Sequence, residues 1–242
     1  MPAPAQTPAQ NQALTPAQLA AVLDHTLLKP EATRAQVERL CEEAAEYKFA
    51  CAMVNPCWVP LAVDRLHGSG VPVGVVIGFP LGASLSGSKV DEAQAVLRAG
   101  AHDVDMVLNI GFLKSGMHAA VQEEIAAIAD VVHGGGILKV ILETALLTED
   151  EKRAASELSV AAGADFIKTS TGFASGGATV PDLRLMRSIA GDRCGVKASG
   201  GIRTLADAIR MLEAGANRIG ASASVAIVNE LAGGAAAAAS GY

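Results

Sequence analysis

The chain has 242 residues, of which 50% are hydrophobic but only 3% aromatic, and its formal net charge is −6. This length fits one large α/β domain as well as two small ones, and an apolar content made mostly of Ala, Val, Leu and Ile suits buried parallel strands. Because no run of Lys and Arg interrupts the negative balance, we expect no nucleic-acid partner and no membrane partner.

The cysteines and the chain ends give expectations about compartment. The four cysteines form no CxxC motif and no zinc-type spacing, so they predict reduced thiols in a cytoplasmic protein. Residues 1–14, rich in Pro, Ala and Gln, lack the pattern of a signal peptide and predict a disordered tail. Residues 233–242, rich in Gly and Ala, predict a second flexible tail. No apolar run has the length of a transmembrane helix.

Between the tails, stretches typical of buried strands alternate with helix-like sequence. We expect a short helix over 16–21, with Thr15 as its N-cap. We expect strands at 22–26, 50–55, 71–78, 103–109, 138–143, 165–172, 195–199 and 217–221. The remaining helices are expected at 33–47, around 63–66, at 88–99 and 114–133, after 148, near 181, at 204–214 and from 222. Capping-box patterns at 88–91, 148–151 and 204–207 support three of these helix starts.

This alternation predicts an α/β fold with a parallel sheet. Eight such units within 15–232 favour a single closed (β/α)8 TIM barrel, with a short N-terminal helix and mobile termini, over an open sheet. No GxGxxG motif follows the first strand, which disfavours a dinucleotide-binding fold.

Charged residues inside the expected strands are the candidate chemistry. Active sites of such barrels lie at the C-terminal ends of the strands, and side chains alternate along a strand. Lys168, Lys197, Asp105 and Glu143 fall at mid-strand or later, so we expect them to point into or above the barrel. Lys139 comes near the start of its strand, so we expect it at the opposite, structural face.

Two lysines and one carboxylate in a small dry space predict an unusual amine. One lysine should lose its proton readily and become a nucleophile that forms Schiff bases, while Asp105 could pass protons. The alternative is a buried ion-pair network that only stabilises the barrel. The residues themselves do not rank Lys168 over Lys197.

Three short loops at the ends of the expected strands predict a phosphate site. They are rich in glycine and hydroxyl groups, which lets backbone N–H groups approach an anion, and the last two strand loops of this fold often bind phosphate. The alternative is that the glycines only make short turns. The three loops are Ser170-Thr171-Gly172, Ser199-Gly200-Gly201 and Gly220-Ala221-Ser222.

Six segments resemble the deoxyribose-phosphate aldolase family, and its two lysine motifs together are specific. The segments are Asp24-His25-Thr26-Leu27-Leu28, Gly78-Phe79-Pro80-Leu81-Gly82, Val104-Asp105-Met106-Val107, Lys139-Val140-Ile141-Leu142-Glu143-Thr144, Phe166-Ile167-Lys168-Thr169-Ser170-Thr171-Gly172-Phe173 and Val196-Lys197-Ala198-Ser199-Gly200-Gly201-Ile202-Arg203. The resemblance implies a class I aldolase, without metal or cofactor, that reversibly cleaves 2-deoxy-D-ribose 5-phosphate to D-glyceraldehyde 3-phosphate and acetaldehyde. It also implies a homodimer or homotetramer.

The resemblance further implies a role for individual residues. Lys168 would form the Schiff base, Lys197 would lower the pKa of Lys168, Asp105 would relay protons, and the terminal Tyr242 would help to shuttle a proton. The residues implied in substrate and phosphate binding are Thr26, Thr171, Gly172, Gly200, Gly201 and Ser222.

Three positions depart from some members of the family. Ala223 replaces a second serine, and Met53 replaces a reactive cysteine. Phe173 replaces a lysine, so the phosphate is expected to be held more by backbone than by charge.

Three other functions stay open on sequence grounds. One is another Schiff-base phosphosugar aldolase or transaldolase, and a second is a phosphate-binding barrel isomerase or synthase without a covalent intermediate. The third is a barrel that binds a metabolite without catalysis. The pairing of Lys168 with Lys197, one βα unit apart, favours the deoxyribose-phosphate aldolase.

Overall fold

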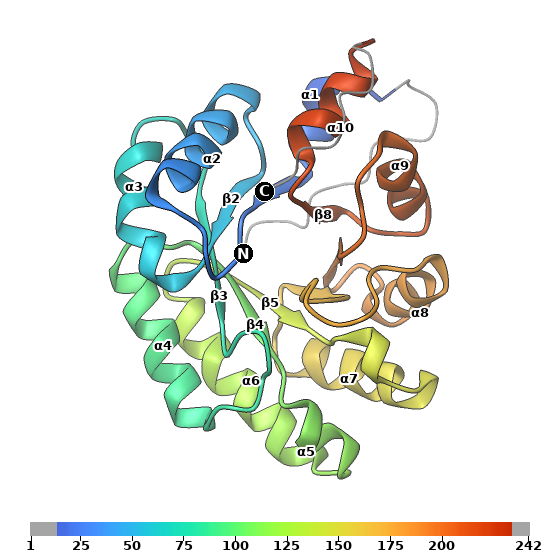
Figure 1. The fold of residues 1–242 in the computed structure, drawn as a ribbon. Coiled ribbons are helices and arrows are strands. Elements are labelled where there is room, and N and C mark those ends of the chain that lie inside the picture. The colour runs from blue at the N-terminus through green and yellow to red at the C-terminus, as the bar shows by residue number, and fades with distance from the viewer. Residues whose placement is uncertain (1–13, 234–242) are drawn as a thin grey trace.

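The computed structural model describes residues 14–233. Eight parallel strands form a closed barrel, in which each strand pairs with the next and β8 pairs with β1 (Figure 1). The predicted TIM barrel is therefore confirmed. Apart from Leu14 and Gly233, the two predicted tails lie outside the described residues, and so does Tyr242. No helix within 14–233 combines the length and the apolar character that a membrane span needs.

The eight strands fall where the apolar runs predict them, although most are shorter at their ends. They are β1 (Leu23–Thr26), β2 (Cys51–Val54), β3 (Val73–Ile77), β4 (Asp103–Val107), β5 (Ile137–Ile141), β6 (Phe166–Lys168), β7 (Gly195–Ser199) and β8 (Arg218–Ala221). The largest difference is at β6, which ends at Lys168. Residues 169–172 leave the sheet there and form the start of a loop at the barrel mouth.

Helices surround the barrel (Figure 1). They are α1 (Pro16–Ala20), α2 (Arg34–Tyr47), α3 (Val59–Leu66), α4 (Ser86–Arg98), α5 (Ile110–Lys114), α6 (His118–Val132), α7 (Glu149–Ala161), α8 (Val180–Ala190), α9 (Leu205–Glu213) and α10 (Ser224–Leu231), with 3-10 turns η1 (Pro56–Trp58) and η2 (Thr144–Leu146). The predicted caps at Thr15, Thr148 and Thr204 are confirmed, because each side chain accepts the N–H of the residue three positions later.

Two helix predictions are wrong. The capping box expected at Ser88 is absent, because α4 begins at Ser86 and its N-cap, Leu85, offers no side-chain oxygen. Near this helix start, the Ser86 hydroxyl donates a hydrogen bond to Glu124 on α6 at 2.9 Å. The helix expected over 114–133 begins later, at His118, because the backbone at Gly116 takes a positive φ of 71° and separates α6 from the short helix α5, which the sequence analysis did not predict.

The barrel interior has two chemically different sides. Outward strand residues pack against the helices in the main core, whereas Leu28, Cys51, Met53 and Val76 form a second apolar cluster with Phe79 against it. Alternation along β2 and β3 places this second cluster inside the barrel, on the side of β1 to β3. The charged inward residues come from β4 to β8 and, through Asp24, from β1, and they form the candidate site.

Candidate active site

Three strands bring Lys168, Lys197 and Asp105 together inside the barrel. Lys168 ends β6, Lys197 is the central residue of β7, and Asp105 is the central residue of β4. The Nζ atoms of the two lysines each donate to Oδ2 of Asp105 at 2.7 Å. All three side chains are buried. The structure thus joins the three residues that strand alternation predicted to converge.

Lys139 lies in the same interior, so the expectation that it sits apart at the structural face is wrong. Strand β5 begins at Ile137, one residue earlier than predicted, which makes Lys139 its central residue and pairs it in register with Asp105. Its Nζ donates to Asp103 Oδ2 at 2.6 Å and lies 3.1 Å from Asp105 Oδ1. Lys139 therefore contacts the carboxylate that the two site lysines share.

Arg218 on β8 and Asp24 on β1 complete the cluster. Nε of Arg218 lies 2.5 Å from Asp24, and its other donor reaches Asp103 at 2.9 Å. Lys197 lies 2.5 Å from the second oxygen of Asp24, as an ion pair. We call these seven side chains the barrel network: Asp24, Asp103, Asp105, Lys139, Lys168, Lys197 and Arg218.

The two site lysines have opposite tendencies to ionise. Burial lowers the pKa of Lys168 to about 8, a change that Asp105 opposes and that the nearby cations Lys197 and Lys139 reinforce. Burial also disfavours the charged form of Lys197, but the carboxylates of Asp105 and Asp24 outweigh it and raise the pKa of Lys197. Near neutral pH, Lys168 can therefore give up its proton while Lys197 remains an ammonium ion.

One group in the described part of the chain has the composition of a metal site. Atoms of Asp24, Cys51 and Asp103 lie within 4.8 Å of one another. However, Lys139 and Arg218 already pair with these carboxylates. Burial, followed by the charge of Asp24, raises the pKa of the Cys51 thiol and keeps it protonated. These three residues therefore suit ion pairs with Lys139 and Arg218 better than they suit the binding of a metal ion.

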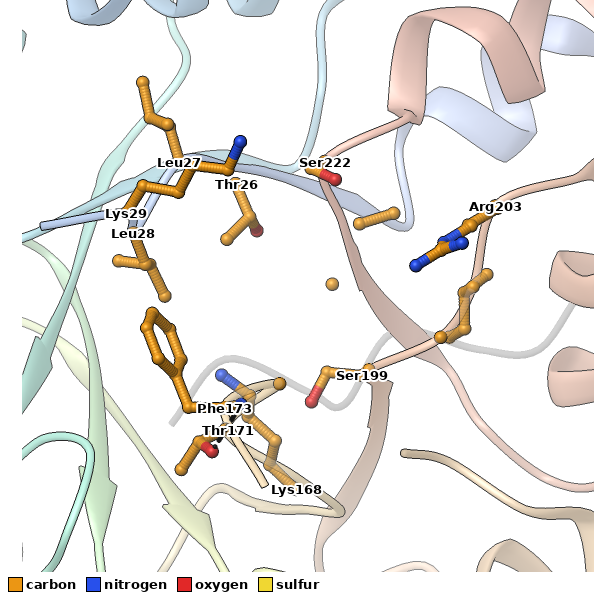
Figure 2. Close-up of a pocket in the computed structure, with 16 residues that line it drawn as sticks. Thr26, Leu27, Leu28, Lys29, Lys168, Thr171, Phe173, Ser199, Arg203 and Ser222 are labelled. Atoms are coloured by element: carbon orange, nitrogen blue, oxygen red, sulfur yellow. Dashed lines mark hydrogen bonds between the residues drawn. The ribbon is translucent and has the colours of Figure 1, made fainter. Parts of the chain in front are cut away.

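A pocket of about 420 Å³ opens above the barrel network (Figure 2). Lys168 reaches into it beside Thr171 (Figure 2), whereas Lys197 and Asp105 are fully buried and do not line it. The residues that the sequence assigns to substrate and phosphate binding all line it: Thr26, Thr171, Gly172, Gly200, Gly201 and Ser222.

The glycine loops that line the pocket have backbone conformations that favour glycine. Gly172, Gly200 and Gly201 all have positive φ angles, of 86°, 86° and 79°, which residues other than glycine rarely adopt. The loops after β6 and β7 also touch, because Ala178 donates its N–H to the Gly200 carbonyl at 3.1 Å. Ser222 lies between the end of β8 and the start of α10.

Two cations that the sequence reasoning did not assign also line the pocket. Arg203 lies on the side of the pocket that carries Ser222 and Ser199, and Lys29 follows β1 (Figure 2). Arg203 could have been found, because it comes two residues after Gly201 in the same loop. The sequence analysis expected backbone groups, more than charged side chains, to hold the phosphate. It did not consider Arg203 and Lys29, which both line the pocket.

Glu143 holds the loop that follows Lys168. Its carboxylate accepts the backbone N–H of Thr171 at 3.3 Å and, through a short hydrogen bond, the Thr171 hydroxyl. Glu143 itself has a left-handed backbone, with φ 56° and ψ 61°, which costs a non-glycine residue about 1–3 kcal/mol. The sequence placed Glu143 in or above the barrel, but nothing in it indicated this contact.

The opposite side of the pocket is apolar. Leu28 and Phe173 lie next to each other there (Figure 2). The ring of Phe173 meets that of Phe79, from the loop after β3, edge to face with centroids 5.3 Å apart. The pocket therefore presents Arg203 with the loops of Ser199 and Ser222 on one side, and the hydrocarbon of Leu28 and Phe173 on the other.

Comparison with known proteins assigns the chain to a family. Residues 18–230 match the model of the DeoC/LacD family aldolases. The chain is 54% identical over 214 residues to a deoxyribose-phosphate aldolase of Caldanaerobacter subterraneus subsp. tengcongensis, covering 88% of this chain and 93% of the relative. It is 55% identical over 214 residues to one of Thermoanaerobacter sp., covering 88% and 96%.

Two solved structures are similar along almost the whole barrel. A putative deoxyribose-phosphate aldolase from Coccidioides immitis superposes with a TM-score of 0.87 at 44% identity, covering 90% of this chain and 87% of that one. The tetrameric deoxyribose phosphate aldolase from Aeropyrum pernix gives 0.84 at 37% identity, covering 90% and 92%. The chain belongs to the DeoC/LacD family of aldolases.

Proposed function

We propose that this aldolase reversibly cleaves 2-deoxy-D-ribose 5-phosphate to D-glyceraldehyde 3-phosphate and acetaldehyde through a Schiff base on Lys168. The observation that carries the proposal is the buried amine of Lys168, whose pKa is lowered to about 8 and which reaches a pocket lined by glycine-rich loops. Relatives more than half identical to this chain bear the name of that activity.

The reaction begins at the sugar aldehyde. The neutral amine of Lys168 adds to C1, and loss of water leaves an iminium ion. Acetaldehyde has two carbons, so the bond that breaks joins C2 to C3. Asp105 accepts the proton of the C3 hydroxyl, directly or through water, and the C2–C3 electron pair moves into the iminium to give an enamine. D-Glyceraldehyde 3-phosphate then leaves.

Protonation of the enamine at C2 restores an iminium, and addition of water releases acetaldehyde and the free amine of Lys168. The ammonium of Lys197 is hydrogen-bonded to Asp105. Lys197 can therefore give a proton to the enamine and take up the proton that Asp105 accepted. The expected help of Tyr242 in this proton transfer belongs to the same proposal and concerns a residue outside 14–233.

The phosphate is assigned to the glycine-rich side of the pocket. Backbone N–H groups of Gly172, Gly200, Gly201 and Ser222 would hold it, with Arg203 and Lys29 supplying positive charge. Thr26 and Thr171 would contact the sugar. The Thr171 hydroxyl already donates to Glu143 and accepts from Phe173, so it keeps only a remaining lone pair for substrate.

Reductive trapping tests the proposal. Acetaldehyde with borohydride should add an ethyl group to Lys168, because hydride reduces the iminium irreversibly, and mass spectrometry of peptides locates the adduct. The same protein should form D-glyceraldehyde 3-phosphate from 2-deoxy-D-ribose 5-phosphate. A variant with Lys89→Met, which lacks a buried lysine on α4, serves as the control and should be labelled like the wild type. No adduct, or an adduct on Lys197, would contradict the assignment.

A homodimer or homotetramer in the cytoplasm completes the proposal. The relative from Aeropyrum pernix is tetrameric, and the four cysteines of this chain are free thiols, as expected in a reducing compartment. Light scattering during size-exclusion chromatography tests the assembly, and a monomer at micromolar concentration would contradict it.

A further inference from the structure

We propose that Lys139, Arg218, Asp24 and Asp103 are positioning residues that set the protonation of the Lys168 amine, because their charges balance those of Asp105 and Lys197. This inference rests on the proposed role of Lys168. None of the four lines the pocket, so they act through Asp105 and Lys197 and not on substrate.

The barrel network balances without the charge of Lys168. Its three carboxylates are 1% exposed or less, and they face the three cations Lys139, Lys197 and Arg218. Protonated Lys168 would add a fourth positive charge for which the network has no carboxylate. An unbalanced charge away from water costs free energy, so the loss of one proton from the network lowers its free energy.

The contacts identify Lys168 as the member that loses its proton. Lys139 lies within 4 Å of Asp24, Asp103 and Asp105, whereas Lys197 and Arg218 each contact two carboxylates. Lys168 contacts a single carboxylate oxygen, on Asp105. Of the four cations, Lys168 therefore has the fewest carboxylate contacts to stabilise its charged form.

Few other titratable groups face this space. Strand β2 contributes the thiol of Cys51, whose pKa is raised by burial, and β3 contributes apolar Val76. Glu143, two residues after β5, accepts a hydrogen bond from the Thr171 hydroxyl. Half-exposed His102 lies 2.8 Å from Asp103, and this hydrogen bond raises its pKa. When His102 is protonated at low pH, it adds a positive charge and so disfavours the ammonium of Lys168 further.

Variants with opposite charge changes test this balance through the pH dependence of acetaldehyde trapping on Lys168. In the wild type the trapping rate should be half-maximal near pH 8. Lys139→Met leaves one carboxylate in excess, so the midpoint should rise by about one pH unit or more, with about tenfold slower trapping at pH 7. Asp103→Asn, which keeps its shape, leaves one cation in excess, so its midpoint should fall by roughly one unit.

The double variant Lys139→Met/Asp103→Asn loses one charge of each sign, and its midpoint should return towards that of the wild type. Lys89→Met is the matched control. Lys89 is also fully buried and pairs with Glu124 at 2.8 Å, but Glu124 is not part of the barrel network. Its loss should reduce thermal stability and leave the midpoint unchanged.

The outcomes separate the two proposals. No adduct on Lys168 of the wild type at any pH overturns the proposed function and this inference together. An adduct whose pH midpoint is the same in wild type, Lys139→Met and Asp103→Asn overturns only the inference, since the deeper residues would then be merely structural. If Lys139→Met does not fold, Asp103→Asn decides, and a midpoint that stays or rises contradicts the charge balance.

Discussion

Lys168 and Lys197 donate to the same carboxylate oxygen, Oδ2 of Asp105, at 2.7 Å each. Two ammonium ions at one oxygen repel each other, and the second carboxylate contact of Lys197, to Asp24, favours its charge over that of Lys168. This shared oxygen therefore links the nucleophile to the group that handles its protons, and several expectations depend on it.

Asp105→Asn should separate imine formation from bond cleavage. The variant removes the proton acceptor, so turnover of 2-deoxy-D-ribose 5-phosphate should fall by about a hundredfold to ten-thousandfold. It also removes the charge that opposes deprotonation of Lys168, so trapping of acetaldehyde should persist at neutral pH. Steady-state assays and reductive trapping measure the two effects. A parallel loss of both would mean that Asp105 only holds the site in shape.

Lys197→Leu should abolish turnover at neutral pH in a protein that still folds. Losing this cation leaves the carboxylates of the network in excess, so the pKa of Lys168 should rise by about one unit or more. Trapping should consequently recover as the pH is raised above about 9. Circular dichroism checks the fold, and rates measured from pH 6 to 10 check the shift. A near-normal rate at pH 7 would remove the role assigned to Lys197.

Glu143→Gln should weaken the binding of phosphorylated sugar more than it affects the chemistry. An uncharged amide cannot accept as strongly from both donors of Thr171, and a hydrogen bond to a charged group contributes about 1.5–3 kcal/mol. KM for 2-deoxy-D-ribose 5-phosphate should rise about tenfold or more, while acetaldehyde, which is too short to reach this loop, should be trapped normally. Glu149→Gln, on an exposed part of α7, is the control. Equal KM values in all three proteins would contradict the role of Glu143.

Arg203→Met should discriminate against the phosphate group alone. The guanidinium lines the glycine-rich side of the pocket, so its loss should raise KM for the phosphorylated sugar by about tenfold. KM for unphosphorylated 2-deoxy-D-ribose should not change. Arg34→Met, at a side chain that is 69% exposed on α2, controls for the loss of surface charge. If both substrates are affected equally, Arg203 supports the loop and does not bind phosphate.

The sequence was sufficient for the barrel and for the meeting of Lys168, Lys197 and Asp105, because period-two alternation and the position of a residue within its strand are local properties. It could not rank the two lysines, since that difference comes from the number of carboxylates around each amine. Lys139 was misplaced for a related reason. Its position depends on the register between β4 and β5, and no single stretch of sequence fixes that register.

Tertiary contacts account for the other differences. Ser86 bonds to Glu124 across two helices, and this contact accompanies the earlier start of α4, whereas a local capping pattern pointed to Ser88. Glu143 reaches Thr171 only because β5 and β6 are neighbours in the sheet. Such partners are far apart in sequence, so patterns within one segment do not reveal them.

The contact between Phe79 and Phe173 makes the barrel mouth asymmetric. It joins the loop after β3 to the loop after β6 through an edge-to-face contact of the two rings. Among the described residues, the pocket is lined from β1, β6, β7 and β8 and the loops that follow them. A phosphorylated sugar would enter this pocket with its aldehyde towards Lys168 and its phosphate at the pocket entrance, close to water.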